Sequence, residues 1–226
     1  MQFEAQVAPF KAGQFTQIGL DLGPERIGRP YSLVNPPQER PLEIYFNAVP
    51  EGPLTPRLSD LNPGDSVWVA AAASGVFTLE AMPAARDLWL IATGTALGVY
   101  LSILRTPDPW ERFQRIYLVH GVRSADELTY GEVIGALRDT HGDRFQFIPA
   151  FSRERRDVVL HGRVPPLLTA GELEGRAGAA IEAEHSHLML CGQAEMIKEV
   201  RTFLEARGMR RHRRNEPGHY TTEQYH

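Results

Sequence analysis

The sequence contains very little cysteine: Cys191 is the one thiol among 226 residues. A single thiol cannot form a disulfide within the chain, and it cannot supply the ligands of a cysteine-rich zinc site or an iron–sulfur cluster. Any redox chemistry of this chain therefore needs a bound organic cofactor. A lone cysteine also fits a reducing compartment, and we expect the protein to be cytoplasmic.

Three other features are missing. No apolar run approaches the length of a membrane span, and no signal-peptide pattern opens the chain. No internal repeat or low-complexity segment is present, and the net charge is only −4, which argues against a nucleic-acid-binding protein. What remains is an ordinary globular composition, 42% hydrophobic and 23% charged. We expect a monomer with no membrane or nucleic-acid partner.

The first eighty residues are divided by turn signals rich in glycine and proline. These signals lie at residues 11–13, 23–24, 35–37, 51–53 and 62–65. The runs between them are rich in β-branched and aromatic residues, for example 15–20, 42–49 and 66–70. Short strands separated by turns at this spacing predict an antiparallel barrel or sandwich.

From about residue 88 the pattern changes to apolar strands that alternate with helical stretches. We expect strands at 88–92, 116–120, 145–148 and 187–190, and helices near 98–105, 124–141 and 193–207. Near-continuous apolar strands in such an alternation predict a parallel sheet that is covered on both faces. The sequence therefore predicts two domains, residues 1–83 and 84–226, joined near Pro83.

The stretch Arg29-Pro30-Tyr31-Ser32 concentrates groups that suit a nucleotide-like ligand. In a strand, Arg29 and Tyr31 share one face, while Pro30 and Ser32 share the other. A guanidinium group matches a pyrophosphate, and a tyrosine ring can lie flat on an isoalloxazine. The alternative interpretation is an amphipathic edge strand with an exposed arginine and tyrosine.

Two glycine-containing junctions follow expected strands in the second half. Thr93-Gly94-Thr95 opens a helix, whose first N–H groups can receive a phosphate, although an ordinary βα turn would look the same. Leu190-Cys191-Gly192 lets a ligand ring approach the backbone closely. No base stands near Cys191 in the sequence, so we do not interpret it as a nucleophile.

Arginines recur after the expected strands, at Arg123, Arg153 and Arg163. If the strands are parallel, at least the first two converge on the rim that holds the Thr93 loop. Guanidinium groups clustered there suit an additional phosphate, such as the 2′-phosphate of NADP, whereas single surface arginines are usually only solvated charge.

A second basic run lies near the end of the chain. It consists of Arg207, Arg210, Arg211, Arg213 and Arg214. A local basic patch on an acidic chain is a candidate docking surface for an acidic protein partner.

Together, these motifs resemble the bacterial ferredoxin–NADP⁺ reductases, in which a flavin-binding barrel with an R-x-Y-S motif precedes an NADP-binding α/β domain. The resemblance runs from Pro9 to His226. It rests on residues 12–16, 29–32, 54–58, 92–96, 190–192 and 214–225. By comparison with that family the chain begins partway into an early strand, so we expect the barrel to lack its first strand.

The resemblance implies roles for particular residues. Arg29 would hold the FAD pyrophosphate with Pro30 beside it, Tyr31 would pack on the isoalloxazine, and Ser32 would lie near the flavin N5. The segments lining FAD would include Phe46, Asn47, Ala48, Leu54 and Thr55. Thr95 would contact flavin and nicotinamide, with Cys191 and Gly192 beside the nicotinamide ring. The adenosine 2′-phosphate would be held by Arg123, Ser152, Arg153 and Arg163. The terminal Tyr225 and His226 would cover the flavin.

The resemblance implies a reductase that transfers hydride from NADPH to FAD and single electrons between FAD and ferredoxin or flavodoxin. Two alternatives stay open at this point. One is an NAD(P)H:flavin reductase that releases reduced flavin, which tight retention of FAD would argue against. The other is a flavin- or nucleotide-binding module without turnover, which would bind the cofactor but show no reduction by NADPH.

Overall fold

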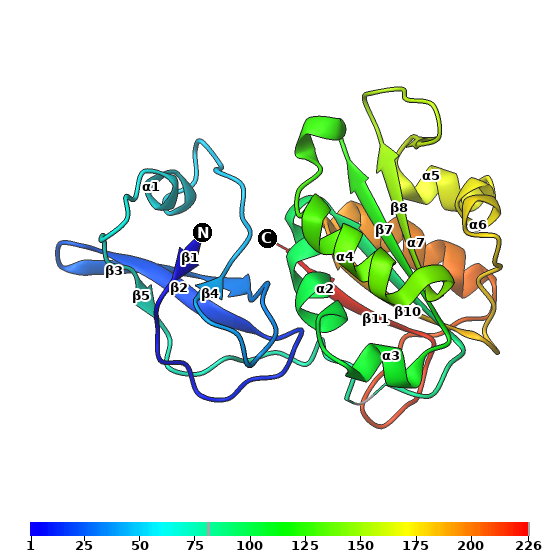
Figure 1. Ribbon diagram of the computed structural model, residues 1–226, viewed down its shortest axis with the longest axis horizontal. Coiled ribbons are helices and arrows are strands. Elements are labelled where there is room, and N and C mark those ends of the chain that lie inside the picture. The colour runs from blue at the N-terminus through cyan, green and yellow to red at the C-terminus, as the bar shows by residue number, and fades with distance from the viewer. Residues whose placement is uncertain (81, 226) are drawn as a thin grey trace. The chain divides into compact units, whose positions relative to one another are not determined.

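The computed structural model describes residues 1–80 and 82–225, and it divides into two compact units (Figure 1). The first unit comprises residues 1–78 and 98–106, and the second comprises residues 79–97 and 107–226. Helix α2, Leu97–Leu104, therefore lies almost entirely in the first unit, whereas the sequence placed it in the second domain. The run of apolar residues in this helix predicts that it is buried. It does not indicate whether the helix packs into the core of the first unit or of the second.

Helix α2 is held in the first unit by close contacts. Ser102 Oγ donates a hydrogen bond of 2.9 Å to the Asn35 carbonyl oxygen. A Cβ on Gly98 would lie 3.1 Å from the Val34 side chain, so this glycine lets the helix approach the strand region closely. The rings of Tyr100 and Phe77 lie 6.1 Å apart.

The first unit contains two small antiparallel sheets. Strands β2 (Phe15–Leu22), β3 (Glu25–Ser32) and β5 (Trp68–Val69) form one sheet in the order β3-β2-β5. Strands β1 (Gln2–Phe3) and β4 (Leu42–Glu43) form the other, and α1 spans Thr55–Ser59. Their shared core includes Ile18, Leu33, Leu42 and Ile44, all fully buried.

Two expected strands of this unit are shorter than predicted. The run 42–49 keeps ladder pairing only at Leu42–Glu43, followed by an isolated bridge at Ile44. Beyond it the chain turns, because the Val49 N–H donates to Thr55 Oγ1 at 2.9 Å and Pro50 follows. The run 66–70 pairs only at Trp68–Val69.

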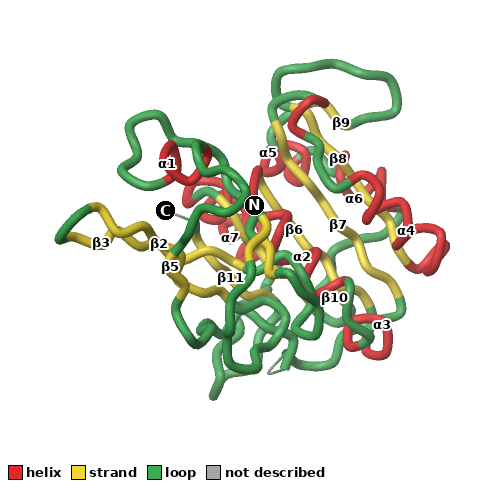
Figure 2. The backbone as a smooth tube through the Cα atoms, turned by 60° about the vertical axis from the view of Figure 1, so that its left-hand side comes forward, coloured by secondary structure: helices red, strands yellow, loops and turns green. Residues whose placement is uncertain are grey.

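The second unit is built on a six-stranded sheet, whose strands are yellow in Figure 2. Every strand pairing in this sheet is parallel. The strand order is β11-β10-β6-β7-β8-β9. The strands are β6 (Asp87–Thr93), β7 (Arg115–Val122), β8 (Phe145–Phe151), β9 (Leu160–His161), β10 (Ser186–Gly192) and β11 (Tyr220–Gln224). The expected parallel sheet is thus confirmed, and its central strands are the near-continuous apolar runs.

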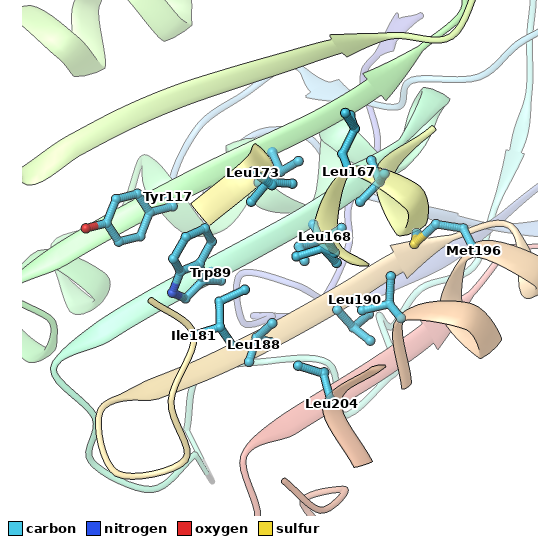
Figure 3. Packing of buried hydrophobic residues seen from close by; sticks show 14 of the residues in the cluster. Trp89, Tyr117, Leu167, Leu168, Leu173, Ile181, Leu188, Leu190, Met196 and Leu204 are labelled. Atoms are coloured by element: carbon cyan, nitrogen blue, oxygen red, sulfur yellow. The ribbon is translucent and has the colours of Figure 1, made fainter. Parts of the chain in front are cut away.

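Helices cover both faces of this sheet. Helix α4 (Gly131–His141) lies in front of it in Figure 1, and α5 (Val164–Thr169), α6 (Glu172–Ala177) and α7 (Ala194–Ala206) lie behind it. The rear helices pack leucines and Met196 onto Trp89 and its strand neighbours, as Figure 3 shows. The remaining elements are α3 (Asp108–Arg112) and the 3₁₀ turns η1 (Gly94–Ala96), η2 (Ala125–Glu127) and η3 (Gly142–Arg144).

The helix expected at 124–141 is wrong in its first part. Residues 125–127 form the separate turn η2, Leu128 is extended with ψ of 118°, and Tyr130 is left-handed with φ of 57°. A left-handed residue cannot continue a right-handed helix, so α4 begins only at Gly131. Within the described ranges, no helix is long and apolar enough to cross a bilayer.

Candidate functional site

In the first unit, β3 ends with the Arg29–Ser32 stretch, along which burial increases from the exposed Arg29 and Pro30 to Ser32. Arg29 is exposed and donates one hydrogen bond of 2.8 Å to the Gly28 carbonyl oxygen, which leaves its other N–H groups without a protein partner among the described residues. Tyr31 is half-buried, and its ring lies edge-on to Phe46 at 6.0 Å. Burial raises the pKa of Tyr31, so its hydroxyl stays neutral. Ser32 is buried at the end of the strand.

The segment 46–55 of the same unit is folded by its own hydrogen bonds. The Gly52 N–H donates to the Val49 carbonyl oxygen at 2.8 Å, and Thr55 Oγ1 accepts from the Val49 N–H. Leu54 is buried in the core, whereas Asn47 and Ala48 are exposed. The structure thus anchors this segment at Leu54 and exposes it at Asn47 and Ala48.

In the second unit, the carboxyl ends of β6, β10 and β11 meet. The Gln193 N–H donates to Thr93 Oγ1 at 3.2 Å, and the Tyr225 N–H donates to the Gly192 carbonyl oxygen at 3.1 Å. Gly192 has φ of 142°, and a Cβ at this position would overlap Thr93 Oγ1. Only glycine fits there. Cys191 and Gly192, which were expected beside a nicotinamide ring, therefore lie at the end of β10, and Tyr225, which was expected to cover a flavin, directly follows the adjoining strand β11.

Cys191 is fully buried in β10. Burial raises the pKa of the Cys191 thiol well above its usual range, while a hydrogen bond with the Tyr225 side chain acts in the opposite direction. The thiol is therefore protonated at neutral pH and is a poor nucleophile. This agrees with the interpretation that Cys191 shapes a site and does not attack a substrate.

His120, which the sequence analysis did not single out, supports the Thr93–Ala96 loop. It is fully buried in β7, and its Nε2 donates to the Gly94 carbonyl oxygen at 2.9 Å. Burial lowers the pKa of His120, so the ring is neutral and holds the loop through one hydrogen bond. Gly94 has φ of 55°, in the left-handed region that favours glycine. Thr95 is half-buried in the same turn.

The expected arginine rim is present. Arg123 directly follows β7, Ser152 and Arg153 directly follow β8, and Arg163 lies just beyond β9. The Arg153 N–H donates to the Arg123 carbonyl oxygen at 2.9 Å, which holds the two chain segments side by side. Because the sheet is parallel, these residues occupy the same rim as the Thr93 loop.

The three guanidinium groups of the rim differ in their partners. Arg123 donates from its backbone N–H, at 2.9 Å, and from Nε to the carboxylate of Glu127. Arg163 pairs with Glu199 at 3.2 Å. Arg153 is exposed and has no side-chain partner among the described residues. Arg153 is therefore the guanidinium most available to a phosphate.

The basic run near the C-terminus is less uniform than its sequence indicates. Arg207 is engaged inside the unit, because it donates to both carboxylate oxygens of Glu174 at 2.7 and 2.8 Å and lies 4.2 Å from the Phe203 ring centroid. Arg210 donates from Nε to the Pro217 carbonyl oxygen at 2.9 Å, and Arg213 lies 3.6 Å from Glu216. Arg211 and Arg214 are exposed, and neither has a side-chain partner in the described ranges.

Three residues of the rim were not anticipated, namely His120, Glu127 and Glu154. Glu154 is an acidic residue among Arg153, Arg155 and Arg156, a signal that the sequence does carry. The expected role of His226 lies outside the described residues. Across residues 1–80 and 82–225, no group of three or more His, Cys, Asp or Glu side chains could hold a metal ion.

Residues 90–202 match the family model described as an oxidoreductase NAD-binding domain. The chain is 43% identical to the flavodoxin/ferredoxin–NADP reductase of Escherichia coli (strain K12), over 98% of this chain and 90% of that protein. It is 33% identical to the ferredoxin–NADP reductase of Pseudomonas aeruginosa, over 95% of this chain and 86% of that protein.

Among solved structures, one similar fold is a ferredoxin NADP⁺ reductase from Neisseria gonorrhoeae with bound FAD and NADP. The TM-score is 0.90 at 30% identity, and the match covers 95% of this chain and 87% of that one. The similarity extends over nearly the whole of both chains and includes both units. The chain therefore belongs to the flavodoxin/ferredoxin–NADP reductase family of oxidoreductases.

Proposed function

We propose that this protein is an FAD-dependent reductase that takes hydride from NADPH and exchanges single electrons with ferredoxin or flavodoxin. The observation that carries this proposal is the parallel-sheet rim, where the Thr93 loop, Cys191–Gly192 and the arginines follow neighbouring strands. Bound FAD supplies the step from two-electron to one-electron transfer, and the protein supplies binding and orientation.

The first unit offers a fitting set of groups for FAD. Arg29 has uncommitted N–H groups for the pyrophosphate, with Pro30 adjacent to it in β3. Tyr31 is fixed by Phe46 and offers a neutral aromatic ring to the flavin. Ser32 would place its hydroxyl near the flavin N5. The segment 46–48 and the pair Leu54–Thr55 would line the rest of the cofactor.

The second unit offers a fitting set of groups for the nicotinamide end of NADPH. Gly192 keeps the strand end free of a side chain that would fill the space beside Thr93. Cys191 stays protonated and apolar, so it can pack against a ring without reacting with it. Thr95 would contact the ring from the loop, and the tail with Tyr225 and His226 would exclude water from the flavin.

NADP preference is assigned to the arginine rim. Arg153 is the guanidinium without a side-chain partner in the described ranges, and Arg123, Ser152 and Arg163 lie in the same or the neighbouring strand-end loops. A paired guanidinium can still share its remaining N–H groups with a phosphate. On this proposal, Arg153→Ala weakens NADPH much more than NADH.

The acidic carrier is proposed to dock on the basic run 207–214. Of its arginines, Arg211 and Arg214 are the ones with exposed and uncommitted side chains, while Arg207 is held by Glu174. Positive charge of this kind accelerates encounter with an acidic partner and is weakened by salt. We also keep the predictions that the protein is a monomer and that it is cytoplasmic.

The double variant Arg211→Ala/Arg214→Ala tests the proposed function together with its docking surface. Its rate of ferredoxin or flavodoxin reduction at low salt is expected to fall by about tenfold, while NADPH-driven reduction of a small dye stays unchanged. Arg138→Ala, an exposed arginine with no side-chain partner in the described ranges, is the matched control. Equal loss of carrier reduction and dye reduction would contradict the docking role of Arg211 and Arg214. A parent protein that reduces neither ferredoxin nor flavodoxin would contradict the proposed function.

A further inference from the structure

A carboxylate lies inside the arginine rim. Glu154 follows Arg153 directly, Arg156 lies two residues further along the chain, and the other two arginines of the rim, Arg123 and Arg163, follow the neighbouring strands. A negative charge beside an anion-binding site repels the anion, so its presence there calls for a task that offsets this cost. The contacts of Glu154 identify that task.

The Glu154 side chain joins two loops that are far apart in sequence. Its Oε2 accepts a hydrogen bond of 2.8 Å from the Ala125 N–H, which belongs to the loop after β7. Its Oε1 accepts from Nε of Arg156, in its own loop after β8. Its backbone carbonyl oxygen accepts from Nδ1 of His161 at 2.9 Å, which ties β9 to the same point. Figure 1 shows the loop after β8 in yellow-green beyond the end of that strand.

The bond to Ala125 has a consequence for Arg123. Ala125 is the first residue of the 3₁₀ turn η2, where the leading N–H groups have no partner within the turn. The last residue of η2 is Glu127, which binds both the backbone N–H and the guanidinium of Arg123. Glu154 therefore fixes the turn, the turn fixes Glu127, and Glu127 orients Arg123.

The same carboxylate also orders the loop that carries Arg153. The side chain of Glu154 is 29% exposed, against 58% for Arg156, so it is the more enclosed partner of that pair. The backbone hydrogen bond from Arg153 to Arg123 lies directly beside it. Backbone hydrogen bonds join the loops after β7 and β8, and the Glu154 side chain adds a further link between them.

We infer that Glu154 is a positioning residue that sets the preference for NADPH over NADH, by holding Arg123 and Arg153 in place for the 2′-phosphate. This inference rests on the proposed NADP site at the arginine rim. It assigns to Glu154 no contact with the nucleotide. The amide of glutamine can replace the carboxylate as acceptor for the Ala125 N–H, whereas alanine cannot.

The test measures binding and kinetics in the flavin-loaded protein for Glu154→Ala, Glu154→Gln and the control Glu184→Ala, an exposed glutamate of the same unit. The first readout is the dissociation constant of 2′-phospho-AMP by calorimetry, with 5′-AMP as the reference ligand. The second is the ratio of kcat/KM for NADPH to that for NADH. Glu154→Ala is expected to weaken 2′-phospho-AMP about fivefold and to lower the ratio equally, the effect of about one lost hydrogen bond. kcat with saturating NADPH and the affinity for 5′-AMP are expected to stay unchanged.

Glu154→Gln is expected to lie within about twofold of the parent in both readouts, because the bond to Ala125 is retained. Three results would overturn the inference. Glu154→Ala could show the same values as the parent, it could bind 2′-phospho-AMP more tightly, or the alanine and glutamine variants could lose equally. Arg153→Ala separates this failure from a failure of the site itself. If that variant binds 2′-phospho-AMP as the parent does, the 2′-phosphate site has been misplaced, and the role of Glu154 falls with it.

Discussion

At the scale of single residues, the packing of the end of β10 against the Thr93 loop depends on Gly192. Its positive φ and the absence of a Cβ allow β10 to end against Thr93 Oγ1, and the Gln193 N–H to bond that oxygen. Gly192→Ala is expected to destabilise the fold by more than about 2 kcal/mol, because it combines a steric overlap with a strained backbone.

A thermal melt of the flavin-loaded protein checks this expectation for Gly192. Gly135→Ala is the matched control, since Gly135 lies within α4 with open space around it. Alanine there is expected to stabilise the helix by up to about 1 kcal/mol. An unchanged melting temperature in Gly192→Ala would mean that β10 can end in another conformation.

His187 makes the stability of the fold depend on pH. It is 1% exposed in β10, and neither ring nitrogen has a hydrogen-bond partner in the described part of the chain. Burial, together with repulsion from the neighbouring His212, His219 and Arg112, lowers the pKa of His187 to about 3. The native state therefore holds His187 neutral at a pH where the unfolded chain, with a pKa near 6.5, is already protonated.

The sign of the effect follows from this difference. Between about pH 6.5 and pH 3 the unfolded chain binds the extra proton, so stability is complete above 6.5 and falls as the pH is lowered. From pH 7 to pH 5 this one site is expected to remove about 2 kcal/mol. His187→Leu is expected to abolish this part of the loss of stability. Urea unfolding at pH 7 and pH 5 measures the loss in each protein, and an equal loss in the parent and the variant would refute the role of His187.

At the scale of elements, Asn35 organises the connection between β3 and β4. Its Nδ2 donates to the carbonyl oxygens of Glu39 and Pro41, both at 2.9 Å, and its Oδ1 accepts from the Glu43 N–H at 3.0 Å. It is only 3% exposed, so these partners would be left unsatisfied without it. Asn35→Ala is expected to cost about 2–4 kcal/mol.

Chemical denaturation in urea measures the cost of the Asn35 change. The exposed Asn215→Ala is expected to shift stability by less than about 0.5 kcal/mol, as surface substitutions usually do. A comparable effect from both variants would mean that the connection is stable without its side-chain bonds.

The elements also show what the sequence could and could not predict. The near-continuous apolar composition of β6, β7, β8 and β10 predicted a parallel sheet, and the sheet order then brought the arginines to one rim. The unit to which α2 belongs was not predictable, because every face of that helix is apolar or small. The role of Glu154 was not predictable either, since its bond to Ala125 spans 29 residues and exists only once β7 and β8 are adjacent.

At the scale of the whole molecule, the proposed function divides the chemistry between the two units. It assigns Arg29 and Tyr31 of the first unit to a flavin, and the Thr93 loop, Cys191–Gly192 and the arginine rim of the second unit to NADPH. Arg29–Ser32 was recognisable from sequence as a motif because its residues are contiguous. The arginine rim was recognisable only in part, because its members come from three strand ends, those of β7, β8 and β9.

The visible spectrum of the purified protein, reconstituted with FAD and then treated anaerobically with NADPH, tests the central claim most directly. The account predicts a bound-flavin spectrum that survives gel filtration and bleaches on addition of NADPH, with NADH much less effective. Flavin that is retained but does not bleach would contradict the reductase assignment, and failure to retain FAD at all would contradict the cofactor site at Arg29–Ser32.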